Sequence, residues 1–184
     1  MDPIYLFIAE GSEELEALGT VDILRRANLD VKIVSITGDL VVTGAHGVKV
    51  QADMLIEQAD FEHTSMIVLP GGLPGAYNLA DCKALAAGIM TQYKAGKLLA
   101  AICAAPLVYG RLGLLDGRKA TCYPGFEKEL RGATYTGLPV TKDGGIVTGK
   151  GPAAVFQFGC ALVECLAGKE RGHDVLKGML FYEM

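Results

Sequence analysis

Short apolar runs alternate with longer amphipathic stretches along most of the chain. Continuous apolar runs are typical of strands buried on both faces of a sheet, and they predict strands over residues 4–9, 31–36, 66–69, 98–102, 119–122 and 146–148. Stretches with helical periodicity predict helices over residues 13–27, 79–95, 105–112, 153–167 and 170–181. Between residues 38 and 50, glycines flank short valine-rich runs, which predicts a β excursion in place of a crossover helix.

The repeated order of strand and then helix predicts the α/β class. We expect a doubly wound, mostly parallel sheet with helices on both faces and right-handed crossovers. The 184 residues fit one domain, and no linker composition divides residues 1–184. In such sheets the chemistry lies beyond the carboxyl ends of the strands. The residues that follow each predicted strand are therefore the candidates for a functional site.

Composition and charge argue against several classes of protein. The chain has 17 Lys and Arg against 21 Asp and Glu, with no long basic run, so we expect no nucleic-acid partner. The longest apolar stretch, residues 98–110, is too short to span a bilayer, and the lack of a basic segment near the N-terminus leads us to expect no secretory signal and no membrane partner. Five cysteines without framework spacing argue against a disulfide scaffold and favour a reducing, cytoplasmic location.

Cys103 is the strongest candidate for chemistry. It directly follows a predicted strand, within the run Ala-Ala-Ile-Cys-Ala-Ala-Pro (100–106). Small residues on both sides permit the strained strand-to-helix turn of a nucleophile elbow. Amides at the start of the following helix are expected to lower the pKa of the thiol. The alternative is a small buried cysteine at the end of a core strand.

Two glycines are the natural partners of this cysteine. Gly71 and Gly72 follow the predicted strand 66–69, and glycine lets the backbone approach a ligand closely. The amides of Gly72 and Ala104 together can form an oxyanion hole beside Cys103. A plain tight turn is the alternative interpretation.

Carboxyl groups cluster after the first strand, where Ser12 is predicted to cap the following helix. A carboxyl group beside the cysteine can hold and shuttle a proton if burial raises its pKa. Surface charge that suits the helix dipole is the preferred interpretation of Glu13 and Glu14. Periodicity alone does not separate Glu16 from these two residues.

The histidines and the other cysteines give weaker signals. His46, His63 and His173 lack metal-ligand spacing, so we expect no metal site. His46, in the β excursion, is the histidine of interest, with an exposed loop residue as the favoured alternative. Cys122 lies near a strand end, where a second reactive thiol has no further support. The remaining cysteines are interpreted as packing residues of helices: Cys82, Cys160 and Cys165.

Four motifs occur in order and at fitting spacing. They are Ala-Glu-Gly-Ser-Glu-Glu-Leu-Glu (9–16), Val-Leu-Pro-Gly-Gly (68–72), Ala-Ala-Ile-Cys-Ala-Ala-Pro (100–106) and Gly-Lys-Gly-Pro (149–152). With these motifs the chain resembles the ThiJ/PfpI superfamily, in particular the branch of the parkinsonism-associated protein deglycase and its bacterial relatives. The resemblance extends from Tyr5 to about Lys169, and the motifs are specific jointly rather than singly.

This resemblance implies a flavodoxin-like fold, a homodimer and an enzyme without a cofactor. Cys103 matches the family's acidic, readily oxidised elbow cysteine, and Glu16 matches the protonated glutamate that hydrogen-bonds its sulfur. Gly72 and Ala104 match the oxyanion donors. Family members are described as acting on methylglyoxal and glyoxal without glutathione, or on glycated adducts, which are reactions of hydro-lyase or hydrolase type.

The resemblance leaves three interpretations open: two of them assign a function to the site, and the third assigns none. The first is a cysteine-dependent glyoxalase or deglycase whose partner is a small aldehyde or a glycated adduct. The second is a redox-responsive stress or chaperone-like protein whose Cys103 is oxidised to the sulfinate. The third is a flavodoxin-like domain whose site is a relic.

The sequence departs from the family pattern at two positions. Tyr123 matches a histidine that many relatives carry near the cysteine, and tyrosine is a poor general base at neutral pH. His46 stands where the branch often has arginine, and we hypothesise that it supplies a titratable ring near Cys103, in one version from the partner subunit. Ala104 replaces the histidine of the peptidase-like branch, which disfavours peptidase activity. The His-x-Glu of the related amidotransferases is missing after the cysteine.

Overall fold

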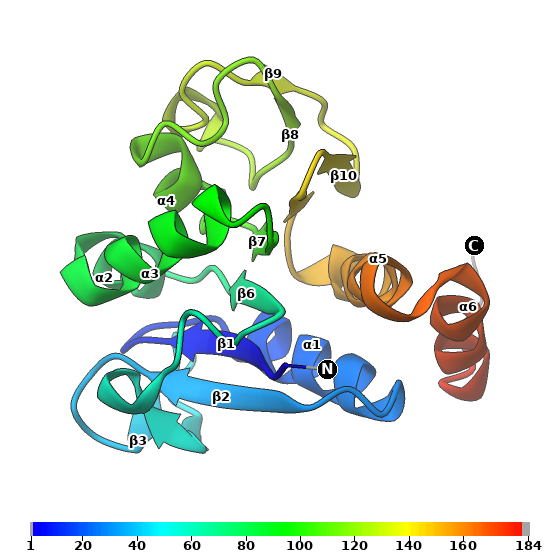
Figure 1. Cartoon of the computed structure of the whole chain (residues 1–184), viewed down its shortest axis with the longest axis horizontal. Coiled ribbons are helices and arrows are strands. Elements are labelled where there is room, and N and C mark those ends of the chain that lie inside the picture. The colour runs from blue at the N-terminus through cyan, green and yellow to red at the C-terminus, as the bar shows by residue number, and fades with distance from the viewer. Residues whose placement is uncertain (1, 182–184) are drawn as a thin grey trace.

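The structure, a computed structural model, describes residues 2–181. Its centre is a seven-stranded sheet with the strand order β10-β11-β7-β6-β1-β2-β5 (Figure 1). β10 runs antiparallel to β11, and every other neighbouring pair is parallel, which confirms the predicted mostly parallel sheet. Its strands are β1 (Ile4–Ile8), β2 (Val31–Ser35), β5 (Met54–Leu55), β6 (Met66–Leu69), β7 (Leu98–Ile102), β10 (Val140–Asp143) and β11 (Ile146–Gly149).

Helices cover both faces of this sheet, as expected for a flavodoxin-like fold. One face carries α1 (Glu14–Arg26), α5 (Val155–Ala167) and α6 (Lys169–Gly178). The opposite face carries α2 (Gly75–Asp81), α3 (Lys83–Lys94) and α4 (Pro106–Arg111) (Figure 1). Each helical layer forms a separate apolar core with its face of the sheet. All five residues of β1 are buried because this strand has neighbours on both edges and helices on both faces, which explains its continuous apolar run.

The predicted helix over residues 79–95 is wrong in its extent. The structure has two helices here, because Cys82 adopts an extended conformation between α2 and α3. The Cys82 N–H donates to the carbonyl of Leu79, and the Cys82 carbonyl accepts from Ala86, so one residue ends one helix and begins the next. Helix α2 also begins earlier, at Gly75, directly after Pro74. This break lets α2 pack on α4 while α3 packs on β6 and β7.

The short strands were the hardest elements to predict. The expected β excursion is confirmed as a hairpin of β3 (Val41–Thr43) and β4 (Lys49–Gln51). The predicted strand 119–122 is only β8 (Lys119–Ala120), which pairs with β9 (Thr134–Tyr135) outside the main sheet. β5, β9 and β10 were not predicted, because they are brief and lack a continuous apolar run. Three short 3₁₀ helices complete the fold: Ile56–Gln58, Glu127–Glu129 and Pro152–Ala154.

Two helix ends differ from the expectation. The N-cap of α1 is Glu13, whose carboxylate accepts the N–H of Glu16, and not Ser12. The Ser12 hydroxyl instead accepts the N–H of Ala9 and so closes the turn after β1. Helix α6 ends at Gly178 rather than at residue 181. Within residues 2–181, no helix is both long enough and apolar enough to cross a membrane.

Candidate active site

Cys103 sits at a strained turn between β7 and α4. Its φ of 64° lies in the left-handed region, which non-glycine residues rarely adopt and which is frequent at functional sites. Two backbone hydrogen bonds hold this turn. The Cys103 N–H donates to Gly149 at the end of β11 over 2.9 Å, and the Cys103 carbonyl accepts from Tyr123 over 2.8 Å. The predicted elbow geometry is therefore present, with a cysteine that is 8% exposed.

Glu16 lies in the first turn of α1 and is completely buried. Its Oε2 accepts the N–H of Gly71 over 2.8 Å. Its Oε1 is buried and has no hydrogen-bond partner among residues 2–181, while the carboxyl group faces the Cys103 thiol. Periodicity could not separate Glu16 from Glu13 and Glu14, but the structure does. Of these three carboxyl groups, only that of Glu16 contacts the Cys103 thiol.

The two glycines after β6 are needed for close approach. A Cβ atom at Gly71 would lie 2.7 Å from the Cβ of Cys103 and 2.9 Å from Oε2 of Glu16. Gly72 has a φ of 85°, and a Cβ there would lie 2.4 Å from the backbone nitrogen of Glu13. Any side chain at either position would therefore push the cysteine, the carboxyl group or the start of α1 out of place.

Two backbone amides approach the cysteine sulfur, as the sequence predicted. The N–H groups of Gly72 and Ala104 hydrogen-bond to it, and both lower the pKa of the Cys103 thiol. Such donors are also placed to stabilise an oxyanion on a carbon bonded to the sulfur. The sheet brings the two amides together because Gly72 follows β6, Ala104 follows β7, and β6 and β7 are parallel neighbours.

Burial and mutual contact govern the ionisation of Cys103 and Glu16. Burial raises the pKa of Glu16 from its ordinary value of 4.5 to about 7. Burial also raises the pKa of Cys103, and the charge of an ionised Glu16 raises it further, more than the amides lower it. The prediction that the helix-start amides lower the thiol pKa overall is therefore wrong: the amides do lower it, but burial and Glu16 raise it by more. The two groups titrate as a coupled pair: the first proton leaves near pH 7, from Glu16, and the Cys103 thiol keeps the second.

Residues 2–165 match the profile of the DJ-1/PfpI family. The chain belongs to this family. Protein DJ-1 homolog B of Arabidopsis thaliana is 43% identical to this chain over 170 residues. The match covers 91% of this chain but only 39% of that protein, so this chain spans less than half of that relative's length. Glutathione-independent glyoxalase DJR-1.2 of Caenorhabditis elegans is 31% identical over 175 residues, which cover 95% of this chain and 93% of that protein.

Solved structures agree with this assignment. The structure of oxidized Toxoplasma gondii DJ-1 has a TM-score of 0.95 and 36% sequence identity to this chain, with 100% of each chain covered. The resemblance to the ThiJ/PfpI superfamily and the flavodoxin-like fold are thereby both confirmed.

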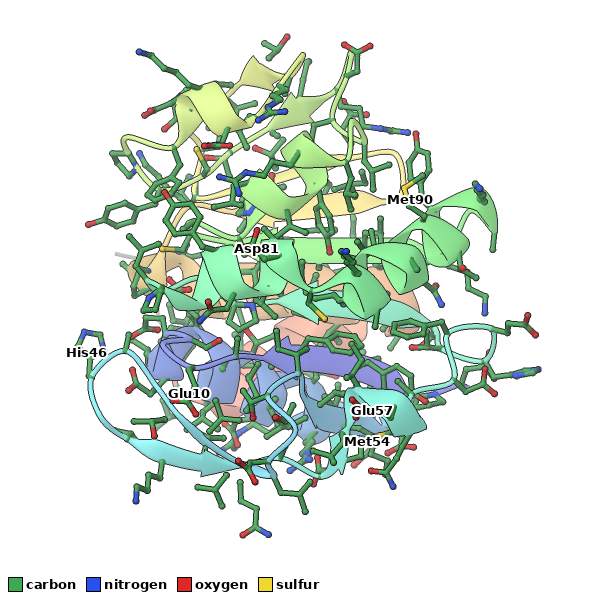
Figure 2. The ribbon with its side chains drawn as sticks, turned by 90° about the vertical axis from the view of Figure 1, so that its left-hand side faces the viewer. Glu10, His46, Met54, Glu57, Asp81 and Met90 are labelled. Atoms are coloured by element: carbon green, nitrogen blue, oxygen red, sulfur yellow. The ribbon has the colours of Figure 1, made fainter. Side chains whose placement is uncertain are left out.

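His46 projects from the loop between β3 and β4, at the edge of the molecule (Figure 2). The ring nitrogen Nδ1 of His46 lies 2.8 Å from Oε2 of Glu14. The backbone N–H of His46 donates to Oε1 of the same carboxylate over 2.7 Å. Despite burial, these hydrogen bonds and one from Val48 lower the pKa of Glu14 to about 2. No hydrogen bond or ion pair joins His46 to Cys103 within this chain's described residues, and a role for His46 in the site of a partner subunit stays a prediction.

Three side chains near this loop bring metal-ligating atoms together. Glu13, Glu14 and His46 each offer one atom, all within 4.8 Å of one another. The other oxygen of each carboxylate is already used: that of Glu13 caps α1 and that of Glu14 accepts two backbone N–H groups. The hydrogen bond between Glu14 and His46 accounts for the arrangement without an ion, and we assign no metal to it.

Tyr123 stands beside the cysteine, but its hydroxyl makes no hydrogen bond within residues 2–181. Its backbone N–H holds the Cys103 carbonyl, and its side chain is 47% exposed. The ring forms one wall of a cavity of about 400 Å³ that also includes Lys150 and Gln157. Gln157 was not among the predicted site residues, although it is the one strongly polar residue in the run Val155–Val163, which is a signal that could have identified it.

The other cysteines lie outside the site. Cys122 is fully buried, and burial raises its pKa to about 12. Unlike Cys103, its sulfur has no backbone amide donor and no carboxyl hydrogen-bond partner within residues 2–181, which argues against a second reactive thiol. Cys160 and Cys165 lie on α5, in agreement with the predicted helix there, and Cys160 is buried as predicted. Cys165 is exposed, so its prediction as a packing residue is wrong. Cys82 packs at the junction of α2 and α3.

Proposed function

We propose that the chain is a cysteine-dependent, cofactor-independent glyoxalase or deglycase that acts on methylglyoxal-type 2-oxoaldehydes or their adducts. One observation carries this proposal: a strained cysteine, a buried carboxyl group with a raised pKa and two backbone amides meet at one point. The name of the Caenorhabditis elegans relative as a glutathione-independent glyoxalase supports the same reaction. The proposal extends to a cytoplasmic location.

The reaction begins when the carboxylate of Glu16 accepts the proton of the Cys103 thiol and the sulfur attacks the aldehyde carbon of methylglyoxal. A carbon–sulfur bond forms, and the amides of Gly72 and Ala104 stabilise the oxyanion of the hemithioacetal. Glu16 donates and accepts the protons, moving one from the former aldehyde carbon to the neighbouring carbon. That carbon is reduced, the sulfur-bearing carbon is oxidised, and a thioester results. Water then cleaves the thioester, so that methylglyoxal and one water give lactate and free thiol.

Glu16 has to serve as the only general acid and base in this scheme. Its pKa of about 7 suits that task, because catalysts of proton transfer work best near the operating pH. Tyr123 adds no neutral-pH base, so we expect slow turnover. We also expect kcat/KM to rise as the pH increases through about 7, where the pair of Glu16 and Cys103 loses its first proton.

The test is lactate formation from methylglyoxal in the absence of glutathione. We expect lactate from the native chain, and a fall in kcat/KM of about 100-fold or more for both Cys103→Ser and Glu16→Gln. Cys122→Ala is the matched control, because it removes a buried cysteine outside the site, and it should retain the native rate. Lactate formation no faster than in Cys103→Ser would overturn the glyoxalase proposal.

The same geometry supports a redox-responsive protein as the second candidate. A protonated Glu16, whose Oε1 lacks a partner, could donate a hydrogen bond to a sulfinate on Cys103. The related Toxoplasma gondii structure is described as oxidized, which favours this candidate. Peroxide titration followed by mass spectrometry tests it: Cys103 should gain two oxygens well before the other cysteines, and Glu16→Gln should slow this step. Equal oxidation of all five cysteines would contradict it.

A homodimer is also part of the proposal. Leu15 and Leu18 on α1 and Val41 and Val48 on the neighbouring hairpin are exposed apolar side chains. Backbone hydrogen bonds join the hairpin to the start of α1, so these side chains belong to adjacent elements. Light scattering should give twice the chain mass, and Leu18→Glu should shift the protein toward the monomer.

A further inference from the structure

The cavity beside Tyr123 has no role in the chemistry described above. Its volume of about 400 Å³ falls in the size range of small-molecule pockets. The walls are mainly apolar, from the ring of Tyr123 and from Pro124, Pro139 and Pro152. Methylglyoxal has five non-hydrogen atoms and reacts through two of its carbons, so it leaves most of this space empty. The cavity therefore fits a larger substrate.

Cys103 is not itself a lining residue of the cavity, but backbone hydrogen bonds join the cavity wall to the turn that carries it. Tyr123, in its wall, donates its N–H to the Cys103 carbonyl over 2.8 Å. Gly149 accepts the Cys103 N–H over 2.9 Å, and the next residues along the chain, beginning with Lys150, form another wall. The cavity thus lies at the carboxyl ends of β7 and β11, on the same edge of the sheet as Cys103.

Two polar groups in the apolar wall have unused hydrogen-bonding capacity. The Lys150 ammonium donates one hydrogen bond, to the carbonyl of Gly137 over 3.1 Å, and forms no ion pair within the described part of the chain. An ammonium group has three N–H donors. The Oε1 atom of Gln157 is buried without a hydrogen-bond donor in residues 2–181; as an acceptor it does not bind an anion, so the anionic preference rests on Lys150. No acidic side chain lines the cavity, so its charge favours an anionic group.

We propose that this cavity selects the substrate of the Cys103 site. The selected substrates are 2-oxoaldehydes in which the two carbonyl groups are attached to a planar apolar group, and this planar group carries a carboxylate. The planar group lies between the Tyr123 ring and the prolines, and the carboxylate pairs with Lys150. This inference rests on the proposed glyoxalase function, because it assigns a substrate class to that reaction. Lys150 is a specificity-determining residue in this scheme and does not touch the reacting carbons.

Three substrates distinguish the effect of substrate size on kcat/KM from the effect of substrate charge. They are methylglyoxal, phenylglyoxal and para-carboxyphenylglyoxal, whose hydroxy-acid products are lactate, mandelate and para-carboxymandelate. For the native chain we expect kcat/KM to increase along this series. Ala153→Leu narrows the cavity from an exposed wall position and should lower the preference for phenylglyoxal over methylglyoxal by about fivefold.

The charge is tested by the ratio of kcat/KM for the carboxylated and the plain phenylglyoxal. Lys150→Met should lower this ratio by about tenfold, since a charge-assisted hydrogen bond is lost. Lys150→Arg should restore most of the ratio, which loss of folding or of general packing would not do. Lys142→Met is the matched control, because Lys142 pairs with Glu164 away from the cavity, and its ratio should equal the native one.

Failure of this inference differs from failure of the proposed function. If the native chain converts all three probes but Lys150→Met keeps the native ratio, the carboxylate assignment is wrong. If Ala153→Leu also keeps the native preference for phenylglyoxal, the cavity does not select the substrate. If no probe is converted, the glyoxalase function is wrong. In that case calorimetric titration with para-carboxymandelate tests whether the cavity binds a planar carboxylate. Binding to the native chain but not to Lys150→Met would support the cavity assignment, and equal or absent binding to both would overturn it.

Discussion

Two carboxyl groups in the first turn of α1 face two different regions of the molecule and behave in opposite ways. Glu16 faces the carboxyl edge of the sheet, is fully buried and forms no ion pair with any residue in the described range 2–181, and its pKa is raised to about 7. Glu14 faces the loop between β3 and β4 and pairs with His46 and two backbone N–H groups, and its pKa is lowered to about 2. Only one residue, Leu15, separates the two along the same helix end.

This contrast shows that the helix dipole alone does not set the charge of these residues. Both carboxyl groups lie near the positive end of α1, which would favour the ionised form of each. Burial without a counter-charge outweighs that preference at Glu16, while hydrogen bonds to the ionised form reinforce it at Glu14. One carboxyl group is thereby available for proton transfer, and the other is fixed as a structural anion.

The largest expected effect of this contrast is on activity. Glu16→Gln should reduce kcat/KM for methylglyoxal by about 100-fold or more, because amides do not transfer protons. Glu14→Gln removes a similar charge from the same helix turn and should change kcat/KM by less than about threefold, since it lies outside the reacting group. Steady-state lactate formation by the two variants, side by side, measures this difference. Equal losses would mean that Glu16 acts only through its charge.

A smaller effect is expected on the pH dependence of stability. Because the pKa of Glu16 is raised in the folded state, its contribution to the free energy of unfolding falls as the pH increases from 4.5 to about 7. This loss amounts to about 2 kcal/mol, reduced from the full value because Cys103 shares the proton. Urea unfolding at about pH 5 and about pH 8 should therefore show a smaller difference for Glu16→Gln than for the native chain.

Glu14 should produce a pH dependence of the opposite sign and at more acidic pH. Its pKa is lowered in the folded state, so its stabilisation is present above pH 4.5 and is lost as the pH falls toward about 2. We expect about 1 to 2 kcal/mol, allowing for screening at the exposed His46 side. Urea unfolding between about pH 5 and about pH 3 should be less pH-dependent in Glu14→Gln. An unchanged slope would show that the pairing with His46 and Val48 contributes nothing in solution.

Much of the fold was predictable because its central strands carry a simple signal. β1, β6 and β7 are buried on both faces, so each is a continuous apolar run that ends where the site begins. The elements that were missed lack such a signal. β10 includes Lys142 and Asp143, and the break at Cys82 depends on where α2 and α3 pack rather than on a helix-breaking residue.

The candidate site was predictable only in part, for a related reason. Cys103, Gly72 and Ala104 follow strands directly, so the topology of a parallel sheet brings them together. Glu16 lies on a helix among other acidic residues, and its selection required the resemblance to a known family. The partners of Glu14 could not be predicted, because the β3–β4 loop reaches α1 through contacts more than thirty residues apart in sequence.

The smallest effect concerns His46 itself. Its hydrogen bond with Glu14 raises the pKa of the imidazole above 6.5, so any stabilisation is present below pH 6.5 and is lost as the pH rises through the raised pKa. The ring is largely exposed, so stability measurements are poorly suited to detect it. Titration of the His46 ring by NMR is the direct measurement: its pKa should fall toward 6.5 in Glu14→Gln, while His63, which pairs with Asp60, should titrate as in the native chain. A His46 pKa that does not change in Glu14→Gln would mean that the loop is not held by this pair, and that the low pKa of Glu14 comes from the backbone N–H groups alone.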